Sequence, residues 1–419
     1  MDRSALQVLM DGRNYLLLQG PMGSFFQELA DWLRSKKRLV HRVIFNAGDK
    51  FYCKDTDYLV FNQSANRFSS WLDEAIRTHH FDTIICFGDC RPMHLSAKKW
   101  ACQNNVRFLA FEEGYLRPNF ITLEEGGVNA FASLPKAPQF YRYFKLPDTE
   151  KPQSIDGHFA PRAWAATCYY LVSWFQRGKF PHYQHHKIFS PWKEMNYWIR
   201  SAWRKQLYRV TERNIIHNLS HNLDKQYYLA ILQVYNDSQI KNHSPYEDVR
   251  EYIEQVIRSF AKYAPQDKYL VFKHHPMDRG HRYYGKLIEK LCSELNIKGR
   301  VIYVHDLHLP TMLKHAKSVV TINSTAGLSA IHHAKSLKVM GNALYDIEGL
   351  TYQHSLDRFW NCNFQPDMKL YHQFRNVLLY KTQLNGVFYS EHRWMQSPLT
   401  TQQTVTHVKP TASQPHRIG

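Results

Sequence analysis

The sequence predicts an α/β protein of two domains, whose parallel sheets face a cleft, joined by a basic, aromatic helical segment. Three observations lead to this fold class. Short, continuous apolar runs alternate with stretches of helical periodicity over residues 1–157. The same alternation returns over residues 223–350. Residues 158–222 between them differ in composition. Continuous apolar strands between helices are typical of parallel sheets covered on both faces.

Length and composition exclude several classes of protein. The 419 residues include 54 Lys+Arg against 36 Asp+Glu, a net charge of +18, with 44% hydrophobic residues. This excludes disorder, collagen and coiled coil. Seven cysteines, an odd number, favour reduced thiols, and neither a signal peptide nor a bilayer-spanning apolar run is apparent. We therefore expect a cytoplasmic protein with an anionic partner: nucleic acid, a membrane surface or a phosphate-bearing substrate.

The first half contains four expected strands. They are residues 15–19, 43–46, 83–88 and 106–111. The first ends at Gly20-Pro21-Met22-Gly23, after which apolar residues recur at helical spacing. Because this turn has neither the dinucleotide-binding nor the P-loop pattern, no dinucleotide fold follows from it.

The second half repeats this alternation of apolar strands and helices. Its expected strands are residues 228–234, 270–273, 301–304, 318–322 and 337–340, with a helix over 246–263. We expect residues 351–395 to return as helices and residues 396–419, which are polar, to be disordered. Ligands of such sheets bind beyond the carboxyl ends of the strands, which is where the polar motifs fall.

The segment 158–222 combines basic and aromatic residues. Residues 161–215 hold ten Lys and Arg against two Glu, and five of the ten Trp. This composition is typical of helices in a membrane interface. An interdomain linker packed on both halves is the alternative, and the two are compatible. Nucleic-acid binding would use the same ingredients, but no helix-turn-helix, zinc-finger or RNP pattern supports it, so we expect no nucleic acid as partner.

Two adjacent carboxylates, Glu112 and Glu113, follow the fourth strand. At a strand's carboxyl end a carboxylate can act as general acid or base towards a cleft. Adjacent side chains in an extended segment point opposite ways, so only one of them can serve the site. A solvated acidic turn, with Arg117 pairing one carboxylate, is the alternative.

Asp237 follows the strand 228–234 in a polar cluster. An aspartate at a cleft mouth can act as nucleophile or electrostatic stabiliser at an oxocarbenium-like centre. It can equally cap the next helix.

Basic side chains end the strand 270–273, in the run Lys273-His274-His275-Pro276 followed by Arg279. This pattern favours a phosphate ligand, with His275 donating a hydrogen bond and Lys273 or Arg279 supplying charge. The neighbouring carboxylates and cysteines lack metal-ligand spacing, so we expect no metal site.

Asn323, Ser324 and Thr325 follow a strand and precede the small residues that open a helix. Hydroxyls beside backbone N–H groups at a helix start can hold a phosphate without a metal, although an ordinary helix cap has the same pattern. Asp89 and Arg91, at the end of the third strand, are further candidates to face the cleft.

Six motifs together resemble the KpsS-type capsule polysaccharide biosynthesis and export proteins. They are Gln19-Gly20-Pro21, Phe87-Gly88-Asp89-Cys90-Arg91-Pro92, Glu112-Glu113-Gly114-Tyr115-Leu116-Arg117-Pro118, Gln233-Val234-Tyr235-Asn236-Asp237-Ser238-Gln239-Ile240, Lys273-His274-His275-Pro276-Met277-Asp278 and Thr321-Ile322-Asn323-Ser324-Thr325-Ala326-Gly327. The resemblance spans roughly residues 10–390, and the acidic, His-Pro and Ser/Thr motifs also look like those of bacterial sialyltransferases.

The resemblance implies a GT-B fold of two Rossmann-like domains and a retaining β-Kdo transferase. Its donor would be CMP-Kdo and its acceptor a (lyso)phosphatidylglycerol lipid, on which capsule polysaccharide is exported by an ABC transporter. By motif position, the resemblance implies that Asp237 is the nucleophile, that Glu113 is the acid/base, and that His275, Ser324 and Thr325 would hold the CMP phosphate. No cofactor is implied. The expected location is the inner face of the cytoplasmic membrane, with other capsule proteins as partners.

Two other functions remain open. One is a CMP-sugar transferase that elongates an existing glycan and has no need of the bilayer. The other is a non-catalytic scaffold that recruits lipid-linked polysaccharide to the exporter and would tolerate loss of Asp237 and Glu113.

Overall fold

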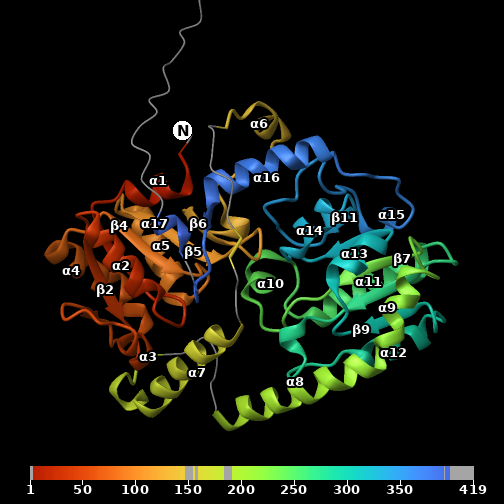
Figure 1. Ribbon diagram of the computed structural model, residues 1–419, viewed down its shortest axis with the longest axis horizontal. Coiled ribbons are helices and arrows are strands. Elements are labelled where there is room, and N and C mark those ends of the chain that lie inside the picture. Colours follow the sequence, from red (N-terminus) through yellow and green to blue (C-terminus); the bar gives the residue numbers. More distant parts are fainter. Residues whose placement is uncertain (1–2, 147–153, 156–158, 184–190, 391, 397–419) are drawn as a thin grey trace, which may run out of the picture.

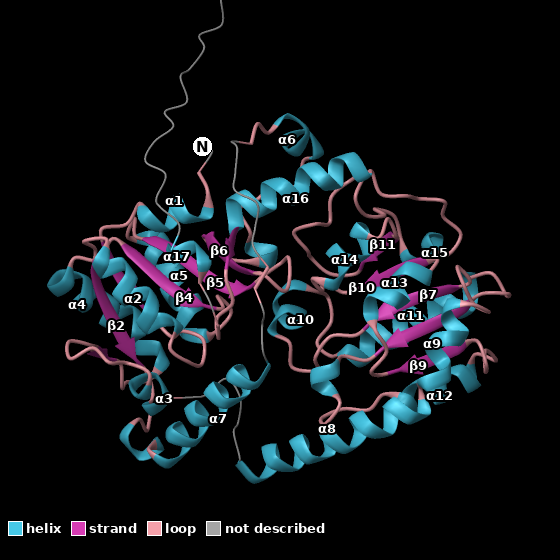
Figure 2. Ribbon diagram, in the orientation of Figure 1, coloured by secondary structure: helices cyan, strands magenta, loops and turns pink. Residues whose placement is uncertain are grey.

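Two α/β domains lie side by side in the computed structural model, which describes residues 3–146, 154–155, 159–183, 191–390 and 392–396 (Figure 1). The first domain contains a seven-stranded sheet and the second a five-stranded sheet (Figure 2). The predicted α/β class with two sheets is therefore confirmed.

The first sheet is mixed, whereas the sequence predicts a parallel one. In order across the sheet its strands are β12 (Gln383–Asn385), β6 (Phe120–Glu125), β5 (Arg107–Glu113), β4 (Thr83–Phe87), β1 (Asn14–Leu17), β2 (Leu39–Ile44) and β3 (Leu59–Val60). β6 is antiparallel to both β5 and β12, and the other pairs are parallel. β6 follows β5 after a short turn, and so short a connection allows only an antiparallel pair.

Helices cover both faces of this sheet. They are α1 (Ala5–Met10), α2 (Phe25–Ser35), α3 (Ala47–Phe51), α4 (Phe68–His79), α5 (Pro92–Gln103) and α17 (Arg393–Gln396). In contrast, α6 (Pro138–Tyr143) places its buried Tyr141 in a core cluster with second-domain residues. Along β1, Tyr15 and Leu17 join a buried core with α1 and α2, while Leu16 joins a core with α4 and α5. This alternation explains why the strand is apolar throughout.

The second sheet is parallel, in the order β11 (Ser336–Val339), β10 (Ser318–Thr321), β7 (Tyr227–Ile231), β8 (Tyr269–Lys273) and β9 (Val301–Val304). Its surrounding helices are α9 (Arg213–Ser220), α10 (Ser238–His243), α11 (Val249–Tyr263), α12 (Gly285–Glu294), α13 (Leu309–His315), α14 (Ala326–His332) and α15 (Leu356–Phe359). Leu229 packs in the core with α13 and α14, and Tyr228 in the core with α11 and α12.

The chain returns to the first domain through α16 (Met368–Thr382), which leads directly into β12 (Figure 1). The returning segment therefore adds a strand to the first sheet, where the sequence predicts helices alone. The ring of Phe374 on α16 packs 5.1 Å from that of Tyr141 on α6. The expected disordered tail falls, beyond Gln396, outside the described residues.

The basic, aromatic segment forms α7 (Phe159–Phe175) and α8 (Pro191–Thr211), in addition to α9. α7 lies below the first domain and α8 below the second (Figure 1). α7 packs so closely on α3 that a Cβ atom on Gly48 would lie 2.5 Å from Ser173 Oγ. α8 is held by Arg204, which donates to the carbonyl of Arg279 (2.7 Å).

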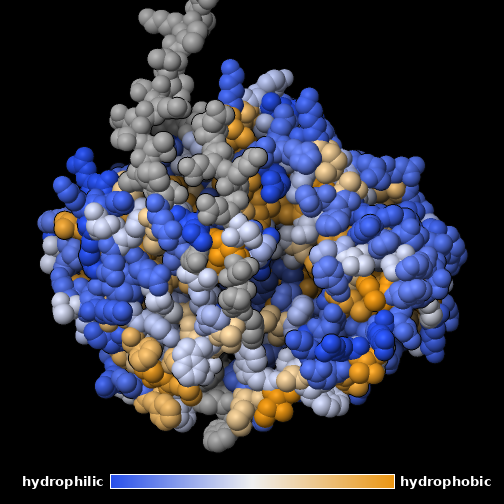
Figure 3. Space-filling view, in the orientation of Figure 1, coloured by the Kyte–Doolittle hydropathy of each residue, from blue (hydrophilic) through white to orange (hydrophobic). Residues whose placement is uncertain are grey.

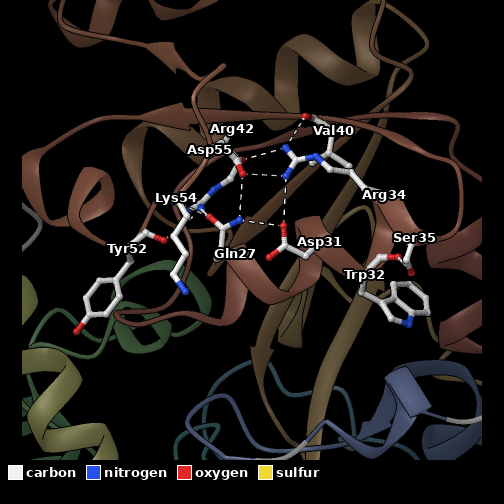
Figure 4. Close-up of polar contacts among 10 residues, drawn as sticks. All are labelled: Gln27, Asp31, Trp32, Arg34, Ser35, Val40, Arg42, Tyr52, Lys54 and Asp55. Atoms are coloured by element: carbon white, nitrogen blue, oxygen red, sulfur yellow. Dashed lines mark hydrogen bonds and ion pairs between the residues drawn. The ribbon is translucent and has the colours of Figure 1, made fainter.

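A polar network fixes the chain between α3 and β3 (Figure 4). Arg34 of α2 forms an ion pair with Asp55 (2.8 Å), and Gln27 donates to the same carboxylate (3.0 Å). Burial alone would raise the pKa of Asp55, but the hydrogen bonds from the Arg34 guanidinium and the Gln27 amide together outweigh it and lower the pKa. Arg42, which is buried, donates to Gln27 Oε1 (2.7 Å). The network thus anchors the residues that follow α3, the helix on which α7 rests.

Candidate functional site

The carboxyl edges of the two sheets meet through α10. The ring of His243, at the end of α10, has its Nε2 3.7 Å from Cys90 Sγ in the first domain. It also packs on Phe131 with ring centroids 4.5 Å apart. Lys136 donates to Asn342 Oδ1 (2.6 Å) across the same boundary. The strand ends that carry the predicted motifs are therefore brought to one region.

Glu112 and Glu113 end β5 and point to different neighbours, as the pleat requires. Glu113 forms an ion pair with Arg162 of α7 (3.2 Å). Glu112 Oε2 lies near Gly88, at the end of β4, and Glu112 Oε1 accepts from the Glu113 N–H (3.0 Å). Glu113 thus belongs to the α7 side of the site, and Glu112 to the side of β4.

The carboxyl group of Glu112 is half-protonated near neutral pH. Burial raises its pKa to about 7, with Glu113 and Asp89 adding like charge and Arg117 opposing it. Arg117 also acts across the domain boundary, because its charge lowers the pKa of His275. Glu112, Arg117 and His275 therefore belong to one electrostatic environment built from both domains.

Tyr389, brought in by the returning chain, lies among the charges of the first domain. Burial raises its pKa to about 12, with smaller effects from Arg162, Glu113, Arg91 and Glu112. The Arg162 guanidinium lies 5.7 Å from the centre of its ring. A tyrosine 276 residues from Glu113 in sequence (389 − 113) thus feels the charges of both glutamates.

Asp237 is the N-cap of α10, so the capping interpretation is confirmed. Its Oδ1 accepts from the Gln239 N–H (2.9 Å), and its Oδ2 accepts from Gln233 Nε2 (3.1 Å). Gln233, which is buried, also donates to Asn323 Oδ1 (3.0 Å). Two N–H donors thus fix the carboxylate, and Asn323 is linked to it through Gln233.

His275 offers a neutral N–H donor. Its Nδ1 accepts from the Met277 N–H (3.2 Å), so the neutral ring carries its proton on Nε2. Burial, with the charges of Lys273 and Arg117, lowers its pKa to about 4. The ring is therefore neutral at pH 7 and able to donate a hydrogen bond to an anion.

The Ser/Thr motif opens α14, a helix of seven residues. Ser324 Oγ accepts from the Ala326 N–H (3.2 Å), which is a local turn. Thr325 is the N-cap residue and its hydroxyl makes no capping hydrogen bond. Close packing fixes this turn, because a Cβ atom on Gly327 would lie 2.3 Å from the Tyr345 hydroxyl.

Three predicted side chains are engaged inside their own domains. Lys273 is buried and donates to the carbonyls of His274 (3.1 Å) and His305, and burial lowers its pKa to about 8. Arg279 forms an ion pair with Asp306. Asp89 is buried and accepts from the Val128 N–H (3.0 Å). Their contacts hold loops that carry the site.

Arg91 begins α5 and donates to Gln19 Oε1 (2.6 Å), while Arg117 donates to the carbonyl of Gly114 (3.1 Å). Sequence reasoning assigned no role to Gln233, Arg162 or Tyr389. Gln233 stands within a quoted motif, and its buried amide is the signal that was available. Arg162 and Tyr389 carry no local signal, since only the tertiary fold brings them to Glu113.

Among the described residues, no group of three or more His, Cys, Asp or Glu side chains is arranged to hold a metal ion. No helix in the same part of the chain is both long and apolar enough to cross a membrane.

The chain thus forms two Rossmann-like α/β domains, with a C-terminal segment that returns to the first domain. A family model described as "Capsule polysaccharide biosynthesis protein" matches residues 82–389. The chain belongs to this family, which confirms the resemblance seen in its motifs.

Curated relatives agree. The chain is 57% identical over 391 residues to the capsule polysaccharide export protein KpsS of Escherichia coli, covering 93% of this chain and 100% of the relative. It is 42% identical over 397 residues to the capsule polysaccharide modification protein LipB of Neisseria meningitidis, covering 93% and 95%.

Among solved structures, Thermosulfurimonas dismutans KpsC, a β-Kdo 2,7 transferase, matches with a TM-score of 0.43 and 13% identity over 86% of this chain and 89% of that one. A Staphylococcus aureus MnaA–UDP structure matches with a TM-score of 0.31 and 12% identity over 92% and 94%.

Proposed function

We propose that this protein is a retaining β-Kdo transferase that moves Kdo from CMP-Kdo to a (lyso)phosphatidylglycerol lipid at the inner face of the cytoplasmic membrane. The product would start the linker for capsule polysaccharide export, with other capsule proteins and an ABC exporter as partners. The observation that carries the proposal is that α10, which Asp237 caps, contacts the first domain through His243, while the charge of Arg117 acts on both Glu112 and the neutral His275. The family membership supports the capsule role.

The second domain would bind the donor. CMP is a good leaving group when its phosphate charge is neutralised, and hydrogen-bond donors can do this without a metal ion. His275 Nε2–H and the Thr325 hydroxyl are candidate donors to the phosphate, together with Ser324. Asn323 would act indirectly, by holding Gln233 and through it Asp237.

Retention requires two displacements. In the first, the Asp237 carboxylate would attack the anomeric carbon of Kdo, and the bond to the CMP phosphate would break. In the second, the acceptor hydroxyl would attack the same carbon, Glu113 would take its proton and Asp237 would leave. The two hydrogen bonds to Asp237 favour this role because they fix the carboxylate orientation without occupying every lone pair.

The ionisation of Glu112 should set the pH dependence of donor binding. Its pKa of about 7 means that a negative charge appears beside the cleft as the pH rises from 6 to 8. Because CMP-Kdo is anionic, we expect its KM to rise by roughly tenfold over this range, about 1.4 kcal/mol. Glu112→Gln should flatten the profile, measured by CMP release at several pH values.

Glu113→Gln is the matched comparison, since it removes the neighbouring carboxylate with the same change of shape. We expect it to lower kcat at every pH. If Glu112→Gln loses turnover and Glu113→Gln remains active, then Glu112 is the acid/base and Glu113 is not.

A surface on α7 and α8 supports action at a membrane. Its exposed apolar side chains come from both helices, and apolar patches appear along this lower side of the molecule (Figure 3). They are Trp164, Leu171 and Phe175 on α7 and Met195, Trp198, Ile199, Trp203, Leu207 and Val210 on α8. Exposed Arg177, Lys179, Lys205 and Arg209 accompany them. Aromatic rings beside cations suit an anionic bilayer surface.

Replacing Trp203 and Val210 together by Ser should weaken binding to phosphatidylglycerol vesicles by at least about tenfold, because each loses apolar area that would enter the interface. Flotation with the vesicles measures this. Tyr143→Ser is the control, because Tyr143 is equally exposed but lies on α6. Equal flotation of the double variant and the wild type would show that this surface does not bind the vesicles.

The proposed reaction is tested by incubating the protein with CMP-Kdo and lysophosphatidylglycerol in EDTA and measuring CMP. Acceptor-dependent release is expected. Equal CMP release from CMP-sialate would show that the donor specificity extends beyond Kdo. CMP release that requires a soluble glycan instead of the lipid would favour the transferase that elongates a glycan. No release with either acceptor, with intact membrane binding, would favour the scaffold.

A further inference from the structure

A cavity of about 220 Å³ lies in the first domain, away from the proposed donor side. It is bounded by the carboxyl edge of the sheet, the first turn of α5 and the chain that follows α7. Its lining includes Gln19, Phe45, Ser64, Arg91, His94 and Tyr183. The volume is several times the ~30 Å³ share of one water, so it can admit a small polar group.

One side of the cavity is suited to an anion. α5 has twelve residues, and its N-cap, Arg91, makes no side-chain capping bond, so the positive end of the helix is open. The Arg91 guanidinium donates to Gln19 Oε1 (2.6 Å), and no ion pair among the described residues joins it to a carboxylate. The nearby carboxylate of Asp49 is already engaged, because it accepts from Gln19 Nε2 (3.3 Å), the Tyr169 hydroxyl (2.8 Å) and the Phe45 N–H (3.1 Å).

A second polar group in the lining, the His94 ring, is a hydrogen-bond acceptor. His94 is 1% exposed and lines the cavity. Its Nδ1–H donates to the carbonyl of Gly88, which leaves Nε2 with a lone pair and, within the described chain, no hydrogen-bond partner. Burial and the charge of Arg91 lower the pKa of this ring to about 3, so Nε2 stays unprotonated. Such an atom accepts a hydrogen bond from a hydroxyl group but cannot donate one to an anion.

Arg91 and His94 together favour a ligand that carries both an anion and a hydroxyl group. The charges of Arg91 and Glu113 both act on the Tyr389 hydroxyl. The residues of the cavity wall that follow α7 are Pro181, His182 and Tyr183.

We propose that this cavity binds the phosphoglycerol headgroup of the acceptor lipid, with the phosphate on Arg91 and the start of α5 and one glycerol hydroxyl on His94 Nε2. The second free hydroxyl of the head glycerol is left for transfer. This inference rests on the proposed function for the identity of the lipid.

Calorimetric titration without any donor tests the site separately from catalysis. The probes are glycerophosphoglycerol, which has no acyl chains, and inorganic phosphate. We expect glycerophosphoglycerol to bind the wild type at least tenfold more tightly than phosphate does. Arg91→Gln should weaken its binding by tenfold or more, and His94→Phe should remove the preference over phosphate. His94→Gln, which keeps an acceptor oxygen, should retain part of it.

Arg77→Gln is the matched control, because Arg77 is an exposed arginine on α4 of the same domain. Equal binding of both probes, or glycerophosphoglycerol binding unchanged in Arg91→Gln and His94→Phe, would overturn the inference. If the headgroup binds in a manner that depends on Arg91 but the protein transfers no Kdo, the headgroup site is supported and the proposed function is rejected. If Arg91→Gln transfers Kdo with an unchanged KM for the acceptor, the proposed function is supported and the headgroup site is rejected.

Discussion

Asp237→Asn is expected to lose Kdo transfer by roughly 10³-fold or more, because an amide cannot form the covalent link that retention requires. The fold should survive. Asn is as good an N-cap as Asp, so the hydrogen bond from the Gln239 N–H can persist. Product formation and the urea midpoint, measured on the same preparation, separate the two effects.

Asp248→Asn provides a matched control. Asp248 caps α11 and accepts from the Arg250 N–H (2.8 Å), the same structural role in the same domain. It belongs to none of the predicted motifs. We expect full transfer from this variant and a similar, small change in stability. Equal activity in both variants would show that Asp237 is only a helix cap.

Gly114→Ala is expected to have the largest effect on stability. A Cβ atom there would lie 2.0 Å from the carbonyl oxygen of Phe120 and 2.7 Å from its carbon. Because these are backbone atoms of β6, they cannot turn aside as a side chain could. We expect a loss of about 3 kcal/mol or more, seen in urea unfolding.

The same substitution should also disturb the site, since Gly114 directly follows Glu113 and its carbonyl accepts from Arg117 (3.1 Å). Gly178→Ala is the control, because no atom lies within 4 Å of its added Cβ. It should change stability by no more than about 0.5 kcal/mol. An equally stable Gly114→Ala variant would contradict the close approach of β5 and β6 at this turn.

Much of the fold could be predicted because its strands are buried on both faces. Such strands are apolar throughout, as in β7, and stand out in sequence. β6 was missed because its residues Thr122, Glu124 and Glu125 read as polar. Burial of Glu124 depends on the hydrogen bond from the Tyr115 hydroxyl (2.6 Å), which no local pattern reveals. β12 was missed because only long-range pairing makes so short a strand.

The candidate site divides in the same way. The motifs correctly located the strand ends that carry Glu113, Asp237 and His275. This was possible because the carboxyl ends of parallel strands meet at one edge of a sheet whatever the side chains are. Motifs could not distinguish a side chain that faces the cleft from one that supports a loop. Lys273 is the example, because its ammonium group is held by two carbonyls inside the domain.

Mass spectrometry of lysophosphatidylglycerol after incubation with CMP-Kdo tests the central claim most directly. The wild type and Asp248→Asn should each convert the lipid to a species heavier by one or more Kdo residues, whereas Asp237→Asn and Glu113→Gln should leave it unchanged. CMP formation with no Kdo-bearing lipid would contradict the assigned acceptor. An unchanged lipid with no CMP formed by the wild type would contradict the transferase itself.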